Sequence, residues 1–557
     1  MVRKGKKHNV KNGFVQKTPM IRKKLLTFPS DSYRHVYDNV HSQLYLFHPI
    51  DKVVDTPEFQ RLRRLKQTGL TNLVYPNSEH TRFTHSLGTY YLALDFVKKL
   101  NENQPALKIT SNDKLCVALA GLCHDLGHGP FSHTYEGIIP KDSNWKHEVA
   151  STEIFRRIMN YPHVREAFEP YLDLDKDIDF VCEMINPPKE FIVNGKWILK
   201  GRPIEKSYLY GFVSNVHDSF DVDKYDYLLR DAKSACPTSL SETTITRIRD
   251  NMRAGLDTRL GFKRLCYATK VKDDLANVAL TRMKLHDNHY QHQKVRACEH
   301  MLFKALDLVD KYFRFVGDDR KEFHLSHAFE DLGAFIKTDD SILSLVNYFP
   351  QKHPDILKAQ AVIRDIELRK IPPLVVETDV TSDMCLDEFK RYVWKKIHKK
   401  MGDDQKDNFF VLEKSLHCGM GLKTHPLSKV LVYNHRANDG INALTGEDVD
   451  ENWKRVWLSF PTGGVRKFLI FSNYDASMEL KNALFEATKA FAKKHKTPSP
   501  VKRTTPVKMN NAEDVGVQVQ QATTSNNAKA KRKVISLEWS TRVTRAMAKG
   551  SSDSNEV

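Results

Sequence analysis

The sequence predicts a mainly α-helical core, followed by a smaller α/β lobe and flanked by disordered basic tails. Apolar residues recur at helical spacing over much of residues 31–325, and short β-rich runs appear after about residue 370. The C-terminal end is low in apolar residues and rich in Lys, Thr, Ser, Asn and Gln. We therefore expect a flexible tail at 1–30, a helical core at 31–325, an α/β lobe at 326–492 and a second tail at 493–557.

Composition excludes several classes of protein. Of the 557 residues, 40% are hydrophobic, which is enough to form sizeable cores. No apolar run approaches the roughly 18–20 residues that span a bilayer, and the basic N-terminus lacks the apolar segment of a signal peptide. Eight cysteines without a CxxC pair argue against a disulfide framework and a structural zinc knuckle. We expect no membrane contact and a reducing intracellular compartment.

The net charge of +18 is concentrated at the two ends. Residues 1–30 contain nine Lys/Arg and no Asp/Glu, and residues 491–557 contain 13 Lys/Arg against five Asp/Glu. Basic appendages serve nuclear import or nucleic-acid contact. The runs RKGKK and KAKRK favour the nucleus, with the cytoplasm as the alternative, and single-stranded nucleic acid is a candidate partner. Ser499 and Thr505 begin S/T-P-x-K motifs, which proline-directed kinases favour.

The expected elements follow the chain in order. A strand and turn at 44–49 precede a helix at 56–69, which begins with Thr56 as N-cap and Pro57 at the first helical position and stops at Gly69. The helix at 111–125 is apolar over most of its surface, which is typical of the centre of a bundle. Further helices are expected at 84–100, 147–159 and 219–233, with one long helix at 278–313. In the lobe, β-rich runs at 372–380, 408–419, 428–434 and 466–473 precede a helix at 477–495.

The stretch GLCHDLGHGPFSH, residues 121–133, concentrates histidines at a predicted helix end. His124 and Asp125 are adjacent, and Gly127 and Gly129 indicate that the helix stops there. A mixed nitrogen and oxygen donor set suits first-row divalent metals. His85 and Asp223 are candidate further ligands from two other helices, which would leave coordination positions open for water and substrate. Taken singly, each of these residues is more often structural than a ligand.

The order H…HD…D resembles the HD-domain phosphohydrolases. Six motifs in the same order make the chain similar, over residues 33–495, to the SAM and HD domain-containing deoxynucleoside triphosphate triphosphohydrolases of animals, here without a sterile alpha motif. The motifs are DTPEFQRLRRLKQTG, HTRFTHSLG, LAGLCHDLGHGPFSH, KGRPIEKSYLY, DVDKYDYLLRD and HYQHQKV. The resemblance implies an HD-domain bundle that hydrolyses dNTPs to deoxynucleoside and triphosphate and so controls dNTP pools.

The resemblance also implies roles for individual residues. Fe, Zn or Mn would activate a water at the metal site, and Mg²⁺ would accompany the nucleotide phosphates. The ligands of the first metal would be His85, His124, Asp125 and Asp223. His133 is the candidate proton donor, oriented by His128, Glu136 and His147; the family usually has aspartate at position 136. The implied substrate-binding residues are Gln67, Arg82, Lys224, Tyr227, Asp231, Arg282, Tyr290 and Gln291.

Regulation is a further implication of the resemblance. GTP and dNTPs would bind at subunit contacts and assemble a homo-oligomer, from dimer to tetramer. The matching nucleotide residues are Val36, Asp55, Gln60 and Arg63. His35, Asp38 and Gln43 replace a lysine, an asparagine and a histidine of the family pattern, which would add an anion beside the activator's polyphosphate. Constitutive activity or an altered activator preference is therefore an alternative.

Two other functions stay open at this stage. One is a different HD-type nucleotide phosphohydrolase, against which the substrate-side residues argue. The other is a nucleic-acid-binding protein with a secondary HD centre, which the basic tails favour.

Overall fold

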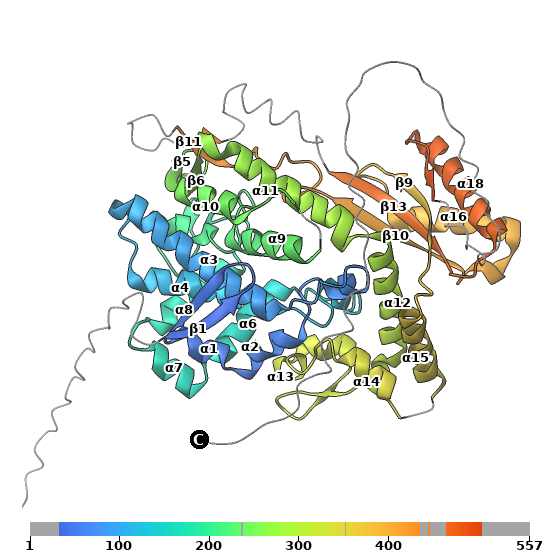
Figure 1. Cartoon of the computed structure of the whole chain (residues 1–557), viewed down its shortest axis with the longest axis horizontal. Helices are drawn as coiled ribbons and strands as arrows, with labels where there is room; N and C mark the ends of the chain where they lie inside the picture. Colours follow the sequence, from blue (N-terminus) through green and yellow to red (C-terminus); the bar gives the residue numbers. More distant parts are fainter. Residues whose placement is uncertain (1–32, 236–237, 351–352, 435–443, 446–463, 504–557) are drawn as a thin grey trace, which may run out of the picture. The chain divides into compact units, whose positions relative to one another are not determined.

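The computed structural model describes residues 33–235, 238–350, 353–434, 444–445 and 464–503, and every structural statement below concerns these residues (Figure 1). For His133, Leu444 and Thr445 it describes the backbone alone. Residues 1–32 and 504–557, with Thr505 and the two runs RKGKK and KAKRK, lie outside the described residues.

Helices dominate the described residues between 33 and 310, as the sequence predicts. Their bounds are α1 Ile50–Val54, α2 Pro57–Arg61, α3 Arg82–Asn103, α4 Ser111–Cys123, α5 His133–Glu136, α6 His147–Met159, α7 Pro162–Phe168, α8 Leu174–Ile185, α9 Val222–Ser234, α10 Glu242–Asp250, α11 Lys272–Leu285 and α12 Gln293–Val309. Short 3₁₀ segments lie at Leu62–Arg64, Gly69–Leu73, Pro105–Leu107, Ile204–Gly211, Thr269–Val271 and Asp310–Tyr312.

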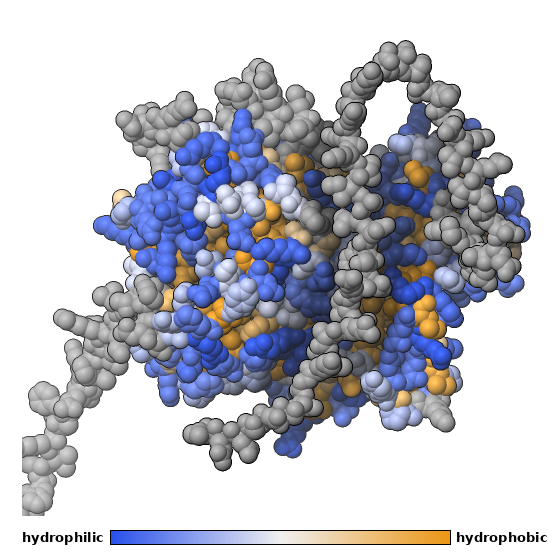
Figure 2. Space-filling model, in the orientation of Figure 1, coloured by the Kyte–Doolittle hydropathy of each residue, from blue (hydrophilic) through white to orange (hydrophobic). Residues whose placement is uncertain are grey.

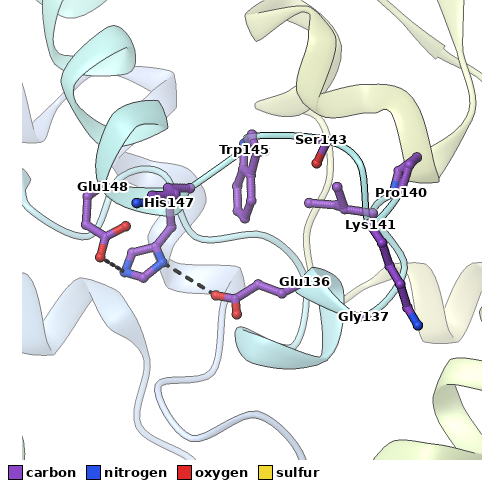
Figure 3. A pocket seen from close by; sticks show the side chains of 10 residues that line it. Glu136, Gly137, Pro140, Lys141, Ser143, Trp145, His147 and Glu148 are labelled. Atoms are coloured by element: carbon purple, nitrogen blue, oxygen red, sulfur yellow. Dashed lines mark ion pairs between the residues drawn. The ribbon is translucent and has the colours of Figure 1, made fainter. Parts of the chain in front are cut away.

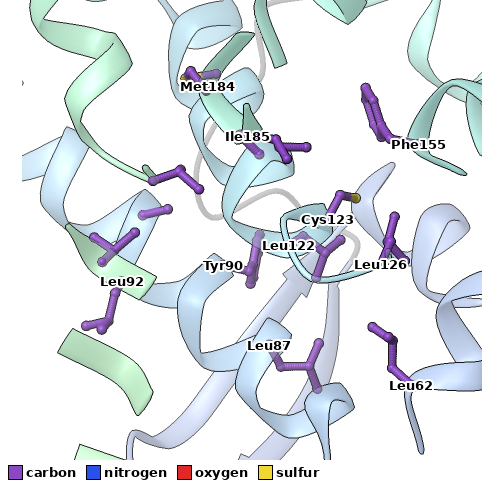
Figure 4. Packing of buried hydrophobic residues seen from close by; sticks show 14 of the residues in the cluster. Leu62, Leu87, Tyr90, Leu92, Leu122, Cys123, Leu126, Phe155, Met184 and Ile185 are labelled. Carbon is purple, nitrogen blue, oxygen red and sulfur yellow. The ribbon is translucent and has the colours of Figure 1, made fainter. Parts of the chain in front are cut away.

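Helix α4 lies at the centre of this bundle. A capping box starts it: the Thr110 side chain accepts from the N–H of Asp113, whose carboxylate accepts from the N–H of Thr110. Every residue of α4 from Leu115 to Cys123 is buried. Its side chains contact those of α3, α6 and α8 (Figure 4). The helix therefore fixes where the chain emerges at His124.

Strands frame the bundle and build the lobe. A hairpin, β1 Tyr33–Asp38 with β2 Ser42–Phe47, precedes the helices, and β5 Met252–Asp257 pairs with β6 Phe262–Ala268. The lobe has a four-stranded antiparallel sheet in the order β10-β13-β9-β14. Its strands are β9 Leu374–Asp379, β10 Phe409–Leu416, β13 Val465–Ser472 and β14 Val501–Lys502. The remaining strands are β3 Ile192–Val193, β4 Lys196–Trp197, β7 Phe315–Val316, β8 Glu322–Phe323, β11 Leu431–Tyr433 and β12 Leu444–Thr445.

Helices of the second half connect bundle and lobe. Helices α16 and α18 pack against each other and bury Phe389 and Phe491, whose ring centroids are 4.8 Å apart. Strand β11 pairs in parallel with β6, so part of the chain beyond residue 370 completes a sheet of the helical half. The helices are α13 Leu332–Phe335, α14 Ile342–Tyr348, α15 Pro354–Glu367, α16 Leu386–Met401 and α18 Met478–His495, with 3₁₀ segments at Leu325–Glu330 and Asp403–Gln405.

The fold class is confirmed, while three expected elements differ. Thr56 and Pro57 start α2 as predicted, but the helix runs only to Arg61 and a 3₁₀ turn to Arg64, because Leu65 is extended and Lys66 forms a β-bridge with Thr81. The long helix expected at 278–313 is broken after Leu285 by a π-helical turn, His286–Tyr290. Part of the tail expected from 493 is ordered structure, because α18 runs to His495 and β14 joins the sheet edge at β9.

Hydrophilic side chains cover most of the face shown in Figure 2, with apolar ones scattered between them. Among the described residues, no helix combines the length and apolar character that crossing a membrane requires.

Candidate active site

Three helices bring the four predicted metal ligands together. His85 lies on α3, His124 and Asp125 follow the last turn of α4, and Asp223 lies in the first turn of α9. His85 Nε2 is 3.2 Å from His124 Nε2 and 3.1 Å from Asp223 Oδ1. Asp125 Oδ1 is 3.4 Å from His124 Nε2, and Asp125 Oδ2 is 3.5 Å from His85 Nε2. All four side chains therefore point at one small volume.

The hydrogen bonds of the two imidazoles fit a bound cation. His85 Nδ1 lies 2.7 Å from Asp226 Oδ2, and His124 Nδ1 lies 2.8 Å from the carbonyl oxygen of Gly121. Because both partners are acceptors, each Nδ1 donates, and the neutral rings turn their Nε2 lone pairs toward each other. Two facing lone pairs need a positive charge between them. The two histidines and two aspartates present here fit a divalent first-row metal.

The surrounding carboxylates also favour protonation of the two ligand histidines, and they raise the pKa of both His85 and His124. Burial lowers the pKa of His85, but hydrogen bonds with Asp223 and Asp226 outweigh burial and raise it to about 10. Burial opposes ionisation of Asp223, but hydrogen bonds from His124 and His85 outweigh it and lower the pKa of this carboxyl below its usual value. Metal and protons therefore compete for the same atoms.

A second histidine cluster adjoins the ligands. The rings of His128 and His147 stack with centroids 4.0 Å apart, and His128 Nε2 is 3.3 Å from Asp125 Oδ1. Burial, with the charges of Arg82 and His147, lowers the pKa of His128 well below its usual value. A Cβ on Gly127 would lie 2.1 Å from the carbonyl oxygen of His147, so only glycine lets α6 approach this closely.

Glu136 completes this cluster, and a separate cavity of about 480 Å³ opens beside it (Figure 3). His147 lies between two carboxylates, with Nδ1 3.5 Å from Glu136 Oε1 and Nε2 3.6 Å from Glu148 Oε1. The side chain of His133, the predicted proton donor, lies outside the described residues, although its backbone begins α5.

The loop that leads to His133 has a strained backbone. Phe131 and Ser132 have φ angles of +55° and +56°, which non-glycine residues rarely adopt. Asp340 stabilises this conformation, because its two carboxylate oxygens accept from the N–H of Phe131 at 2.6 Å and of Lys66 at 2.8 Å. Asp340 comes from a segment about 210 residues away, and the sequence offered no sign of this role.

A cavity of about 470 Å³ extends from the metal ligands. All eight predicted substrate-binding residues line it, together with Asp125, Asp223, His128 and His147. Sequence reasoning missed Thr68, His286, Arg296 and Glu299, which also line it. His286 was obscured by the interpretation of 278–313 as one helix, since the π turn is what directs this segment into the cavity.

Cations and buried acceptors are distributed along the cavity. Arg82 contacts Asp125 and donates to Ser132 Oγ at 2.8 Å, and Lys224 Nζ donates to Asp221 Oδ2 at 2.8 Å. Arg282 Nε and Gln67 Oε1 are buried without a partner among the described residues. Such atoms are satisfied in most folded proteins, so a ligand is the natural partner here.

Asp231 organises the end of the cavity away from the metal. Its Oδ1 is 2.6 Å from His80 Nε2, and its Oδ2 accepts from the Tyr290 hydroxyl at 2.5 Å. Gln291 Nε2 donates to the carbonyl oxygen of Ser415 at 2.9 Å, which links this end to β10 of the lobe.

The four predicted activator residues lie outside this cavity. Val36 is on β1, Gln60 accepts from Arg63 Nε at 2.7 Å, and Arg63 stacks over the Phe83 ring at 3.6 Å. Asp55 forms a two-pronged ion pair with Arg34, at 2.8 and 2.7 Å.

The expectation that Asp38 adds an anion beside the activator's polyphosphate is wrong. Asp38 is buried, accepts from Arg230 and from the N–H groups of Val40 and His41, and is not placed to face a surface ligand. His35 and Gln43 flank Tyr45 on the hairpin, and the cation that faces Asp55 is Arg34. At the other end of the chain, Ser499 is exposed between α18 and β14.

Comparison with known proteins gives the family. The HD domain model matches residues 82–186, which contain three of the four ligands. The chain is 35% identical over 424 residues to the deoxynucleoside triphosphate triphosphohydrolase SAMHD1 of Danio rerio, covering 74% of this chain and 67% of that protein. The SAMHD1 proteins of Gallus gallus and Homo sapiens are each 35% identical, over 411 and 393 residues, covering 71% and 68% of this chain. These matches span 66% and 61% of those two relatives. The chain therefore belongs to the SAMHD1 family of HD-domain proteins.

Proposed function

We propose that this chain hydrolyses deoxynucleoside triphosphates to deoxynucleoside and inorganic triphosphate and so limits dNTP pools. One observation carries the proposal: a two-histidine, two-aspartate cluster lies at one end of a cavity that continues past three cations to a carboxylate and a tyrosine. The names of the relatives give the same reaction.

The metal end supplies the hydrolytic chemistry. His85, His124, Asp125 and Asp223 would hold a divalent Fe, Zn or Mn ion, which lowers the pKa of water and neutralises charge that develops on phosphate oxygens. Arg82, Lys224 and Arg282 bind the triphosphate with its Mg²⁺, since arginine presents paired donors to phosphate. His133 gives a proton to the leaving 5′-oxygen, and His128, Glu136 and His147 orient it.

The far end selects the sugar and base. Asp231, held by His80 and Tyr290, accepts a hydrogen bond from the 3′-hydroxyl, while Tyr227 and Tyr290 exclude a 2′-hydroxyl by bulk. Gln67 and Gln291 complete this end.

Regulation and location form part of the same proposal. GTP and dNTPs would bind near Val36, Asp55, Gln60 and Arg63 and assemble a homo-oligomer up to a tetramer. The likeness to the family supports this, and ligand entry would have to displace Arg34 from Asp55. The basic tails support nuclear import and contact with single-stranded nucleic acid, and Ser499 and Thr505 are candidate phosphorylation sites.

Product analysis tests the proposal. The purified protein is incubated with dGTP, and with dATP in the presence and absence of GTP. The control is a double variant, His124→Ala with Asp125→Ala. We expect deoxynucleoside and intact triphosphate, reduced by at least about 1,000-fold in the control because metal chemistry is lost. Release of phosphate or pyrophosphate, or no hydrolysis under any condition, would contradict the proposal. A GTP requirement for dATP would support the activator site.

A further inference from the structure

A buried carboxylate, Asp226, connects the ligand His85 to the β1–β2 hairpin. One oxygen, Oδ2, accepts from His85 Nδ1 at 2.7 Å. The other, Oδ1, is 2.6 Å from His41 Nε2, and His41 lies in the turn of the hairpin. Because a carboxylate only accepts, both imidazoles donate to it. The Asp226 side chain therefore bonds to the hairpin through one oxygen and orients the metal ligand His85 through the other.

Arg230 closes the connection. Its guanidinium donates to Asp226 at 2.9 and 3.0 Å and to Asp38 Oδ2 at 2.8 Å. Asp38 in turn accepts from the N–H groups of Val40 and His41, which sets the shape of the hairpin turn. The side chains of Asp38, His41, Asp226 and Arg230 are each at most 4% exposed, so solvent replaces none of these bonds.

Asp226 and Arg230 pack closely against α3, which the absence of a side chain at Gly88 allows. A Cβ on Gly88, one turn after His85 on α3, would lie 1.9 Å from Asp226 Oδ1 and 2.4 Å from Arg230 Nη2. The His41 ring also contacts the Tyr91 ring, with centroids 5.1 Å apart. A continuous series of buried contacts thus runs from His41 in the hairpin through Asp226 to the metal ligand His85.

We propose that His41 is a positioning residue of the metal centre: through Asp226 it fixes the His85 ring, so that the β1–β2 hairpin sets the metal affinity of the site. The proposal rests on the metal site of the proposed function and deepens it. Partners of this kind, which hold the outer nitrogen of a ligand histidine, change metal affinity by about 10- to 100-fold when removed. The hairpin also holds Val36, one of the predicted activator residues, and Arg34, which pairs with Asp55. A ligand bound there would therefore contact the same hairpin that positions His85.

The test compares two substitutions of His41 in the full chain. His41→Leu removes the donor to Asp226, whereas His41→Gln keeps an N–H donor of similar reach. Metal content and the dissociation constants for Mn²⁺ and Zn²⁺ are measured against a competing chelator, and the Tm of the metal-free protein is recorded. His300→Leu is the matched control, because His300 is a half-buried histidine whose ring stacks on Phe410 and makes no contact with the four metal ligands.

We expect His41→Leu to weaken metal binding by about 10- to 100-fold. His41→Gln should recover most of the affinity, and His300→Leu should leave it unchanged. At saturating metal, kcat should fall more than KM changes. If His41→Leu does not fold, His41→Asn replaces it, since the shorter amide does not reach Asp226.

Two results would overturn the inference. One is wild-type metal affinity in His41→Leu together with a lower Tm, which would make the contact purely structural. The other is an equal loss of affinity in the Leu and Gln variants. Metal affinity is measured without nucleotide, so the two proposals can fail separately. If metal affinity depends on His41 as expected but the protein hydrolyses no dNTP, only the proposed function is contradicted.

Discussion

At the scale of single residues, Asp340 has the role that is most easily tested: it stabilises the loop that precedes His133. Phe131 and Ser132 hold positive φ angles, each of which costs about 1–3 kcal/mol, so other contacts must maintain them. Asp340 supplies two such contacts through the N–H groups of Phe131 and Lys66.

Asp340→Ala should therefore relax the loop. We expect kcat for dNTP hydrolysis to fall about 10- to 100-fold, and the free energy of unfolding to fall by about 1–3 kcal/mol from the two lost hydrogen bonds. Metal content should stay unchanged. Asp339→Ala is the control, because Asp339 contacts Arg64 and Ser341 instead of the loop. An unchanged kcat in Asp340→Ala would show that the loop holds its shape without this carboxylate.

Residue-scale prediction from sequence succeeded where spacing and chemistry coincide. His124 and Asp125 stand at a glycine-marked helix end, and the combined order with His85 and Asp223 suggests a metal. Asp226 could not be found this way, because a carboxylate three residues after Asp223 is indistinguishable from a helix-surface acid until His41 is brought beside it. Asp340 is hidden for the same reason, since its partners lie more than 200 residues earlier.

At the scale of elements, the π turn between α11 and α12 shapes the end of the cavity that lies away from the metal ligands. The turn, with the non-helical residues Gln291 and His292 after it, interrupts what the sequence presents as one amphipathic helix. Apolar periodicity continues on both sides and Pro is absent, so no local signal marks the break. Tertiary hydrogen bonds stabilise the break instead. Tyr290 donates to Asp231, and Gln291 donates to the carbonyl oxygen of Ser415.

Deleting Asn288 should abolish this arrangement. Loss of one residue rotates the rest of the π turn by about 100° around the helix axis, which carries Tyr290 and the adjoining Gln291 out of register. We expect kcat/KM to fall more than about 100-fold, with the helical circular dichroism signal retained. Asn288→Ala keeps the register and exposes no new apolar surface, so it should keep its activity. Full activity of the deletion variant would refute the role assigned to the turn.

At the scale of the whole molecule, neutral histidines that are buried or half-buried make stability depend on pH. Burial lowers the pKa values of His217, His289 and His300 to about 4, with Arg264 adding to the effect at His217 and Lys304 at His300. In the unfolded chain the same groups titrate near 6.5. The folded protein therefore binds fewer protons between these values, so stability is complete above about pH 6.5 and is lost as the pH falls toward 4.

Denaturant unfolding at pH 7.5 and pH 5 measures this loss. We expect about 1–2 kcal/mol less stability at pH 5 for each of the three histidines. His300→Phe should reduce the difference by one such step, since the new ring can stack on Phe410 without titrating. His163→Gln, at an exposed position, should leave the difference unchanged. An equal pH dependence in His300→Phe and the wild type would contradict the assignment.

The general architecture was accessible from sequence because helical periodicity and β-rich runs are local. The assembly of the lobe was harder to predict from sequence. Strand β14 pairs with β9 about 125 residues earlier, and Arg503 donates to Glu377 beside this pairing. Composition marked this segment as a tail, and a two-residue strand is too short to produce a period.

The metal ligands also have a consequence for the lifetime of the protein. His85 and His124 are 39 residues apart, and His85 and Asp223 are 138 residues apart. An ion that joins them acts as a crosslink that closes two loops and removes conformational freedom from the unfolded chain. A cell short of the metal would then contain fewer molecules of this protein as well as less active ones. Without the ion the chain unfolds more often, and proteases degrade the unfolded form.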